Sequence, residues 1–229
     1  MSTNAEKKLQ TEFNEWAEAG RGDEMERHHM PIFEPTLPLM DVKPTDRVLD
    51  LGCGSGWATR LIAKRFHPKK IVGIDISDEM VRRAEEQSKG IANIEFRQGA
   101  AEKIPLPDAS IDKIFSIESF YYWPDQMTGL KEVKRVLTPG GKLFILINLY
   151  KDNHYSLRWA DELKVPVHAL SQAEYIDLLT KAGFSGAEAR RVPDNSPTPD
   201  EYFGKWFKNA KELREFKQIG ALLLIARRP

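Results

Sequence analysis

The sequence predicts an α/β protein with a Rossmann-like, seven-stranded and mostly parallel sheet, helices on both faces, and a small helical cap at the N-terminus. Three observations predict it. An apolar run over 48–51 leads into the glycine-rich stretch 52–56 and then into an amphipathic helix over 57–66. From residue 46 onward, short apolar runs alternate with amphipathic segments, which is typical of right-handed βαβ units. Asp75 ends the next apolar run, where a carboxylate can accept hydrogen bonds from a ribose.

Residues 1–44 are expected to form the helical cap. Apolar residues on one helical stripe predict a helix over 5–19, and Gly20 ends it. A further turn or two is expected over 23–30, before a segment that three prolines interrupt.

Residues 45–149 are expected to form the ligand-binding core. Strands are predicted at 47–51, 70–75, 93–97, 112–117 and 141–149, and helices at 57–66, 78–89 and 126–137. Ser77 is placed to cap the second of these helices, since its side chain can accept a hydrogen bond from the first turn.

The remaining chain divides into a lid insertion at 150–170 and a C-terminal part of the same domain at 171–229. The lid has many aromatic residues and no clean periodicity. A capping box at Ser171 predicts a helix to Ala182, and strands are expected at 186–192 and 219–227. Between these strands the chain is aromatic without a regular pattern.

Composition narrows the classes of function. The 229 residues carry 34 Lys and Arg against 34 Asp and Glu, so the net charge of zero disfavours a nucleic-acid partner. The single cysteine, Cys53, cannot form an internal disulfide, which indicates a reducing compartment. The N-terminus lacks the apolar core of a signal peptide, and the longest apolar run, 219–226, is too short to span a bilayer. We therefore expect a cytoplasmic protein with no membrane partner, as a monomer or homodimer.

The glycine loop has the spacing Gly-x-Gly-x-Gly and follows Asp50. A dinucleotide-binding loop would have the spacing Gly-x-Gly-x-x-Gly, because a pyrophosphate needs several amides at a helix N-terminus. A ligand without phosphate needs only close backbone approach. The loop and Asp75 together predict an adenosine-type cofactor across the ends of two parallel strands.

At this point the sequence resembles the class I S-adenosylmethionine-dependent methyltransferases, in a small-molecule, methyltransferase type 11-like branch. The resemblance runs from about Val42 to Asn148. Five ordered motifs carry it: Leu49 to Gly56, Gly73 to Met80, Gly99 to Asp108, Asp112 to Ser119, and Val136 to Lys142. It implies the cofactor S-adenosylmethionine, with S-adenosylhomocysteine as product, and a last strand that runs antiparallel.

The resemblance also implies roles for individual positions. Asp75 would bind the ribose hydroxyls, and the loop backbone would contact the methionine and sugar. The implied cofactor residues are Asp50, Gly52, Cys53, Gly54, Gly56, Trp57, Asp75, Ile76, Met80, Ala100, Ala101, Glu102, Ile117 and Glu118. One departure concerns adenine: many relatives carry Asp at position 100, and Ala100 cannot accept a hydrogen bond from the adenine amino group.

The expected partner is a small-molecule acceptor. An atom of this acceptor would attack the methyl group in line. Candidate acceptor contacts are Trp16, Tyr121, Tyr122 and Tyr155, and candidate bases are His29, His28 and Tyr122. The adjacent histidines point about 100° apart on a helix, so we expect no metal. An NAD-dependent oxidoreductase and a non-catalytic binding protein with the same fold are the alternatives.

Overall fold

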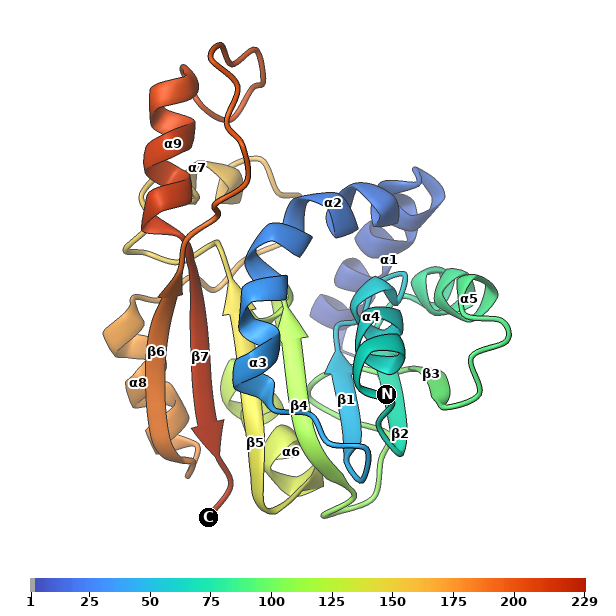
Figure 1. The fold of residues 1–229 in the computed structure, drawn as a ribbon. Coiled ribbons are helices and arrows are strands. Elements are labelled where there is room, and N and C mark those ends of the chain that lie inside the picture. Colours follow the sequence, from blue (N-terminus) through green and yellow to red (C-terminus); the bar gives the residue numbers. More distant parts are fainter. Residues whose placement is uncertain (1–2) are drawn as a thin grey trace.

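The sheet has seven strands in the order β3-β2-β1-β4-β5-β7-β6 (Figure 1). This computed structural model describes residues 3–229. The strands are β1 (Arg47–Leu51), β2 (Lys70–Asp75), β3 (Ile94–Gln98), β4 (Ile111–Ile117), β5 (Leu137–Ile147), β6 (Ser185–Val192) and β7 (Ala221–Arg227). Neighbours from β3 to β5 pair in parallel, and β7 pairs antiparallel with both β5 and β6. The predicted fold class and the antiparallel last strand are confirmed.

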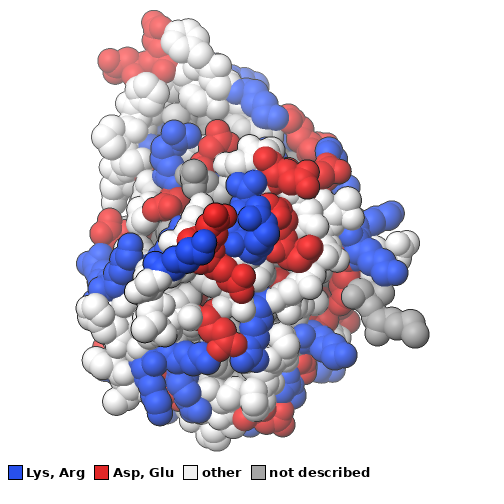
Figure 2. All heavy atoms as spheres, turned by 90° about the vertical axis from the view of Figure 1, so that its right-hand side faces the viewer, with Lys and Arg blue, Asp and Glu red and all other residues white. Residues whose placement is uncertain are grey.

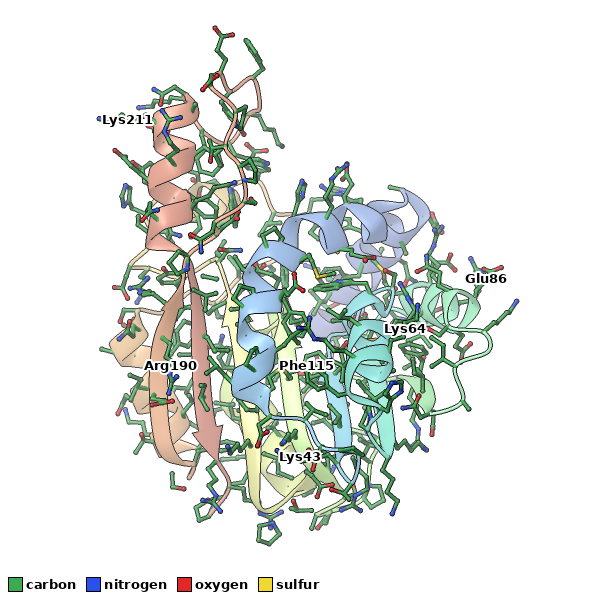
Figure 3. The ribbon with its side chains drawn as sticks, in the orientation of Figure 1. Lys43, Lys64, Glu86, Phe115, Arg190 and Lys211 are labelled. Carbon is green, nitrogen blue, oxygen red and sulfur yellow. The ribbon has the colours of Figure 1, made fainter. Side chains whose placement is uncertain are left out.

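Side chains alternate between the two faces of the sheet, and each face is packed by helices. Helices α3 (Leu37–Met40) and α4 (Trp57–Phe66) cover one face; α6 (Gln126–Val136) and α8 (Gln172–Lys181) cover the other. On β4, Ile114 joins the second layer and Phe115 the first. Figure 3 shows Phe115 between the strands and the helices in front, where its ring stacks on Phe33 at 5.7 Å between centroids.

The N-terminal helices lie above the carboxyl ends of the central strands (Figure 1). Helix α1 (Asn4–Glu18) is tied to α5 (Asp78–Gln87): Gln10 and Asn14 donate hydrogen bonds to one oxygen of Asp78, at 2.9 and 3.0 Å. Helix α2 (Arg21–Phe33) follows, and a 3₁₀ turn, η1 (Glu34–Thr36), leads to α3. The expectation of one or two turns over 23–30 was too short, because Pro31 falls in the last turn of α2 and does not end it.

The C-terminal segments rise above β6 and β7 (Figure 1). They contain α7 (Leu157–Ala160) and α9 (Ala210–Ile219), which the sequence pattern did not predict. Asn209 caps α9 by accepting a hydrogen bond from the Glu212 amide at 3.0 Å. The strand expected from residue 219 begins at Ala221, because Gly220 breaks the backbone with a φ of 76°.

The strand expected at 141–149 lies at Leu137–Ile147 instead. It pairs with β4 already at Leu137, so the Pro-Gly-Gly turn is part of the strand and not a separate linker. Within residues 3–229, no helix is both long and apolar enough to cross a membrane.

Candidate functional site

The glycine loop bends directly after β1 and is held to the end of β2. The amides of Gly52 and Cys53 both donate to the Ile74 carbonyl, at 2.8 and 3.0 Å. Gly52 and Gly54 have φ values of 81° and 51°, which glycine adopts at little cost. A Cβ on Gly52 would lie 2.0 Å from Ser119 Oγ, whereas one on Gly54 would meet nothing within 4 Å. The loop therefore presents bare backbone at Gly54 to open space.

Asp75 lies at the end of β2, beside this loop. Its Oδ2 accepts from the Gly54 amide at 2.8 Å, and its Oδ1 accepts from the Ser77 amide at 2.9 Å. Burial raises the pKa of Asp75, while these amides oppose the shift. Each carboxylate oxygen has two lone pairs, so the group can still accept two hydrogen bonds from a ligand's hydroxyls.

A cavity of about 330 Å³ opens at these two features. Of the predicted cofactor residues, the following line it: Gly52, Cys53, Gly54, Trp57, Asp75, Ile76, Met80, Ala100, Ala101, Glu102, Ile117 and Glu118. The structure thus brings together residues from the ends of four neighbouring strands, which is where open α/β sheets bind ligands.

Asp50 and Gly56 do not line the cavity. Asp50 is buried beneath the loop, where Thr59 donates a hydrogen bond to it at 2.6 Å. Burial raises the pKa of Asp50 to about 7. Gly56 is needed for packing, because a Cβ there would lie 2.6 Å from the ring of Phe96.

Glu118 follows β4 with a positive φ of 53°, which is unusual for a residue other than glycine. Its carboxylate accepts from the Tyr121 hydroxyl at 2.8 Å and from the Asn148 amide at 2.6 Å. Burial raises the pKa of Glu118 to about 7. This buried carboxyl therefore fixes the short helix η2 (Phe120–Tyr122), which holds both tyrosines at the cavity.

A second cavity, of about 930 Å³, adjoins the first. The two share a wall made of Trp16, Arg21, His28, His29, Tyr121, Tyr122, Trp159 and Trp206. Phe13, which lines only the smaller cavity, packs behind this wall: its ring meets the rings of Trp16 and Tyr122 edge-on, each at 5.1 Å between centroids. Trp16, Tyr121 and Tyr122 were predicted to contact the acceptor, and they lie at this junction.

Tyr155 lies outside both cavities. Its hydroxyl is bound to the Glu215 carboxylate, and its ring packs with Phe207. The prediction missed this because α9, which carries Glu215, was not expected. Tyr155 stabilises the projection formed by α7 and α9.

His28 and His29 both line the junction, and the pKa of His29 is lowered to about 4, chiefly by burial and then by the neighbouring His28. His29 is therefore neutral near pH 7. Burial also raises the pKa of the Cys53 thiol, and its side chain packs with Val81 and Phe96, so it is not a nucleophile at neutral pH. Among the described residues, no group of three or more His, Cys, Asp or Glu side chains could hold a metal.

Several lining residues were not predicted: Arg21 and Gly22 at the start of α2, Ser119 after β4, and Trp159 and Trp206 in the C-terminal segments. Gly22 approaches the loop so closely that a Cβ there would lie 2.7 Å from Ser55 Oγ. The stripe of apolar residues on α1 was a usable signal, since it faces the cavity and not a separate cap core.

Comparison with known proteins agrees with this geometry. Residues 49–145 match the family model described as a methyltransferase domain. A solved Haloferax volcanii protein, taken to be a methyltransferase and determined in complex with the Trm112 methyltransferase activator, is 31% identical, with a TM-score of 0.91 over 95% of this chain and 98% of that one. The chain belongs to the class I S-adenosylmethionine-dependent methyltransferases. The predicted family and its cofactor are confirmed.

The chain is also similar to other named methyltransferases. A solved SAM-dependent methyltransferase from Aquifex aeolicus is 25% identical, with a TM-score of 0.61 over 88% of this chain and 93% of that one. Among curated proteins, a fatty-acid O-methyltransferase of Mycolicibacterium smegmatis is 34% identical over 52% of this chain and 43% of its own length. A 2-methyl-6-phytyl-1,4-hydroquinone methyltransferase of Oryza sativa is 32% identical over 64% of this chain and 41% of its own. The chain thus spans less than half the length of these two relatives.

The residues present fit this cofactor. Asp75 retains acceptor capacity for two hydroxyls, Gly54 leaves room for close backbone approach, and Ile76 and Met80 provide apolar surface beside it. Ala100 supplies no carboxylate to the cavity. Glu102 lies on the same cavity wall, and its carboxylate accepts a hydrogen bond from the Asp125 amide at 3.0 Å.

Proposed function

We propose that this protein transfers a methyl group from S-adenosylmethionine to a small-molecule acceptor. One observation carries the proposal: a cofactor-sized cavity at the glycine loop and Asp75 shares an aromatic wall with a second, larger cavity. A donor in the first and an acceptor in the second would meet at that wall. The size of the second cavity, about 930 Å³, suits an organic molecule.

When bound, S-adenosylmethionine supplies an activated methyl group on a sulfonium. The protein's own part is to bind and orient. Asp75 would hold the ribose, and the backbone at Gly54 would admit the ligand closely. We propose that residues 1–44 act as the cap and 150–170 as the lid, which exclude water and align the two molecules. Lys164 links these segments through ion pairs to Glu15 at 2.9 Å and Glu12 at 3.6 Å.

A general base near the acceptor would be His29, which is neutral at pH 7 and lines both cavities. The tyrosines serve this role less well. Burial raises the pKa values of Tyr121 and Tyr122, so neither hydroxyl ionises at neutral pH. We assign Tyr122 to packing against the acceptor.

The test is turnover measured by mass spectrometry. The protein is incubated with S-adenosylmethionine and a panel of apolar acids, phenols, amines and alcohols, and both S-adenosylhomocysteine and a product heavier by one methylene are quantified. Asp75→Ala is the control with an impaired donor site. The proposal is supported if wild type forms both products and Asp75→Ala forms neither. Tight donor binding with no product from any acceptor supports the non-catalytic alternative instead.

Two alternatives receive less support. An NAD-dependent oxidoreductase activity does not agree with the chain's membership of the methyltransferase family. A nucleic-acid acceptor would require a basic surface, and Figure 2 shows Lys and Arg interspersed with Asp and Glu over the face it presents. Cytoplasmic location and the monomeric or dimeric state stay predictions.

The Haloferax volcanii neighbour suggests a protein partner, since it was solved with the Trm112 activator. We propose that this chain also binds a Trm112-type protein, because the similarity extends over 95% of its length. Co-expression with such a protein and size-exclusion chromatography would test this. Co-elution as a stoichiometric complex is the expected result, and separate elution at micromolar concentration would contradict it.

A further inference from the structure

The side chains that line the larger cavity indicate the chemical class of the acceptor, an inference that rests on the proposed function. Eight Trp, Tyr and Phe side chains form much of its wall, among them Trp16, Tyr122, Trp159, Trp206 and Phe216. These residues come from α1, η2, the 150–170 segment and the chain around α9. Such a surface favours an apolar body over a sugar or a peptide.

The carboxylates on the same wall all have ion-pair partners. Its carboxylates are each matched by a lysine: Glu12 and Glu15 by Lys164, Glu162 by Lys205, and Asp194 by Lys217. Lys164 serves two of the four carboxylates, but Arg21 and Arg27 also line this cavity, so five Lys and Arg side chains face four Asp and Glu and the wall has no surplus negative charge to attract a cation. An acceptor amine would therefore find no free carboxylate in the larger cavity.

Arg21 differs from these lysines. Its guanidinium lies 4.4 Å from the centre of the Trp16 ring, and it makes no ion pair with the side chains that the structure describes. It also acts electrostatically on the Tyr122 hydroxyl, which places its charge at the junction. Within the described residues, it is the one Lys or Arg that lines both cavities. A planar guanidinium held on an aromatic ring is well suited to bind an oxyanion through two parallel hydrogen bonds.

We propose that the acceptor is an apolar molecule with an acidic oxygen, a carboxylate or a phenol, and that Arg21 holds this oxygen at the junction while the aromatic wall binds the apolar body. The acceptor oxygen forms the new O–CH₃ bond as the S–CH₃ bond breaks, and the electron pair of the broken bond stays on sulfur. A negative oxygen and a positive sulfonium thus give two neutral groups. A carboxylate arrives ionised and needs no base, whereas a phenol passes its proton to the neutral imidazole of His29 at the junction, and from there to solvent, before the attack.

The first experiment compares four acceptors with similar apolar bodies: dodecanoate, 4-octylphenol, dodecan-1-ol and dodecylamine. Formation of S-adenosylhomocysteine above background is expected with dodecanoate or 4-octylphenol, and the better of these identifies the kind of oxygen. A preference for the alcohol or the amine would overturn the proposal. If none of the four turns over, calorimetry with dodecanoate and the phenol on the S-adenosylhomocysteine complex decides, and absence of binding overturns it.

The second experiment tests Arg21 itself. Arg21→Gln should raise KM for the acid at least 10-fold and leave the Kd for S-adenosylhomocysteine within twofold, with Arg21→Lys between the two. Arg190→Gln is the matched control, since Arg190 is exposed on β6 (Figure 3), lines neither cavity, and pairs with Glu188. An equal loss of S-adenosylhomocysteine affinity in Arg21→Gln would mean that Arg21 serves the donor's own carboxylate, and would refute the assignment.

The two levels of proposal fail differently. If wild type does not bind S-adenosylhomocysteine at all, the proposed function fails together with this inference. If wild type binds it and methylates only alcohols or amines, the proposed function stands and the assignment of an acidic oxygen is wrong.

Discussion

The same added methyl group should affect different properties at Gly52 and Gly54: chiefly the stability of the fold at Gly52, and chiefly the affinity for the ligand at Gly54. Both have positive φ, and alanine in that region costs about 1–2 kcal/mol, of which about 0.4–1 kcal/mol is returned because alanine restricts the unfolded chain. In Gly52→Ala the new Cβ also meets Ser119 Oγ at 2.0 Å and Ser119 Cβ at 2.5 Å. Such overpacking adds about 1–3 kcal/mol. We expect Gly52→Ala to be destabilised by about 2–4 kcal/mol in total.

In Gly54→Ala the Cβ meets nothing within 4 Å, so the free energy of unfolding should fall by about 1 kcal/mol or less. The methyl group would instead occupy cavity space that the ligand needs. We expect the affinity for S-adenosylhomocysteine to fall about 10- to 100-fold, equivalent to about 1.4–2.7 kcal/mol. Gly90→Ala is the matched control, because Gly90 has a φ of 87°, is open around its Cβ, and lies in the turn before β3, away from the cavity.

The assays are thermal unfolding without ligand and calorimetry with S-adenosylhomocysteine. For a chain of this size, Gly52→Ala should lower Tm by about 4–16 °C, whereas Gly54→Ala and Gly90→Ala should each lower it by about 4 °C or less. Only Gly54→Ala should keep its Tm near that of Gly90→Ala and still lose affinity. Unchanged affinity in Gly54→Ala would refute the argument that the ligand approaches the backbone at this position.

Three further outcomes follow from the buried groups and from the junction. Because burial raises the pKa of Glu118 to about 7, above its value of about 4.3 in an unfolded chain, the stability from this group falls as pH rises from about 4 to 7. Glu118→Gln should therefore flatten the dependence of Tm on pH in that window and raise Tm at pH 8; an unchanged slope would contradict the assigned burial. Thr59→Val removes the 2.6 Å hydrogen bond to buried Asp50 and should cost about 1–3 kcal/mol in denaturant unfolding, whereas a loss below about 0.5 kcal/mol would show that this bond is dispensable. Trp206→Ala, at the shared wall, should raise the acceptor KM about 10-fold with the Kd of S-adenosylhomocysteine nearly unchanged, and the reverse pattern would place Trp206 at the donor.

Much of the donor half could be predicted from the sequence, because its signals are local. The glycine loop, Asp75 and the motif after β4 each follow directly from one strand end, and parallel strands bring their carboxyl ends to one edge. The glycine loop and Asp75 were therefore predicted from order and spacing, whereas the other predicted positions that line this cavity came from the resemblance to the methyltransferase family. Asp50 was assigned to the cofactor on the same basis, but its side chain points beneath the loop to Thr59.

The acceptor half was harder, because it is assembled from segments far apart in the sequence. Arg21, Trp159 and Trp206 meet at the junction only through the packing of α1, α2 and the C-terminal projection. No local pattern reveals such a meeting. Helix α9 was missed for a related reason: its apolar face is short and follows an aromatic run that hides its period, so Tyr155 was placed at the acceptor when it instead binds Glu215.

The central claim is that the cavity at the glycine loop and Asp75 binds S-adenosylmethionine. Calorimetric titration of wild type and Asp75→Ala with S-adenosylmethionine and S-adenosylhomocysteine, with NADH as comparison, tests it most directly. The account predicts micromolar binding of both sulfur compounds by wild type, a loss of about 100-fold or more in the variant, and no binding of NADH. Binding of NADH in preference, or undiminished binding by Asp75→Ala, would contradict it.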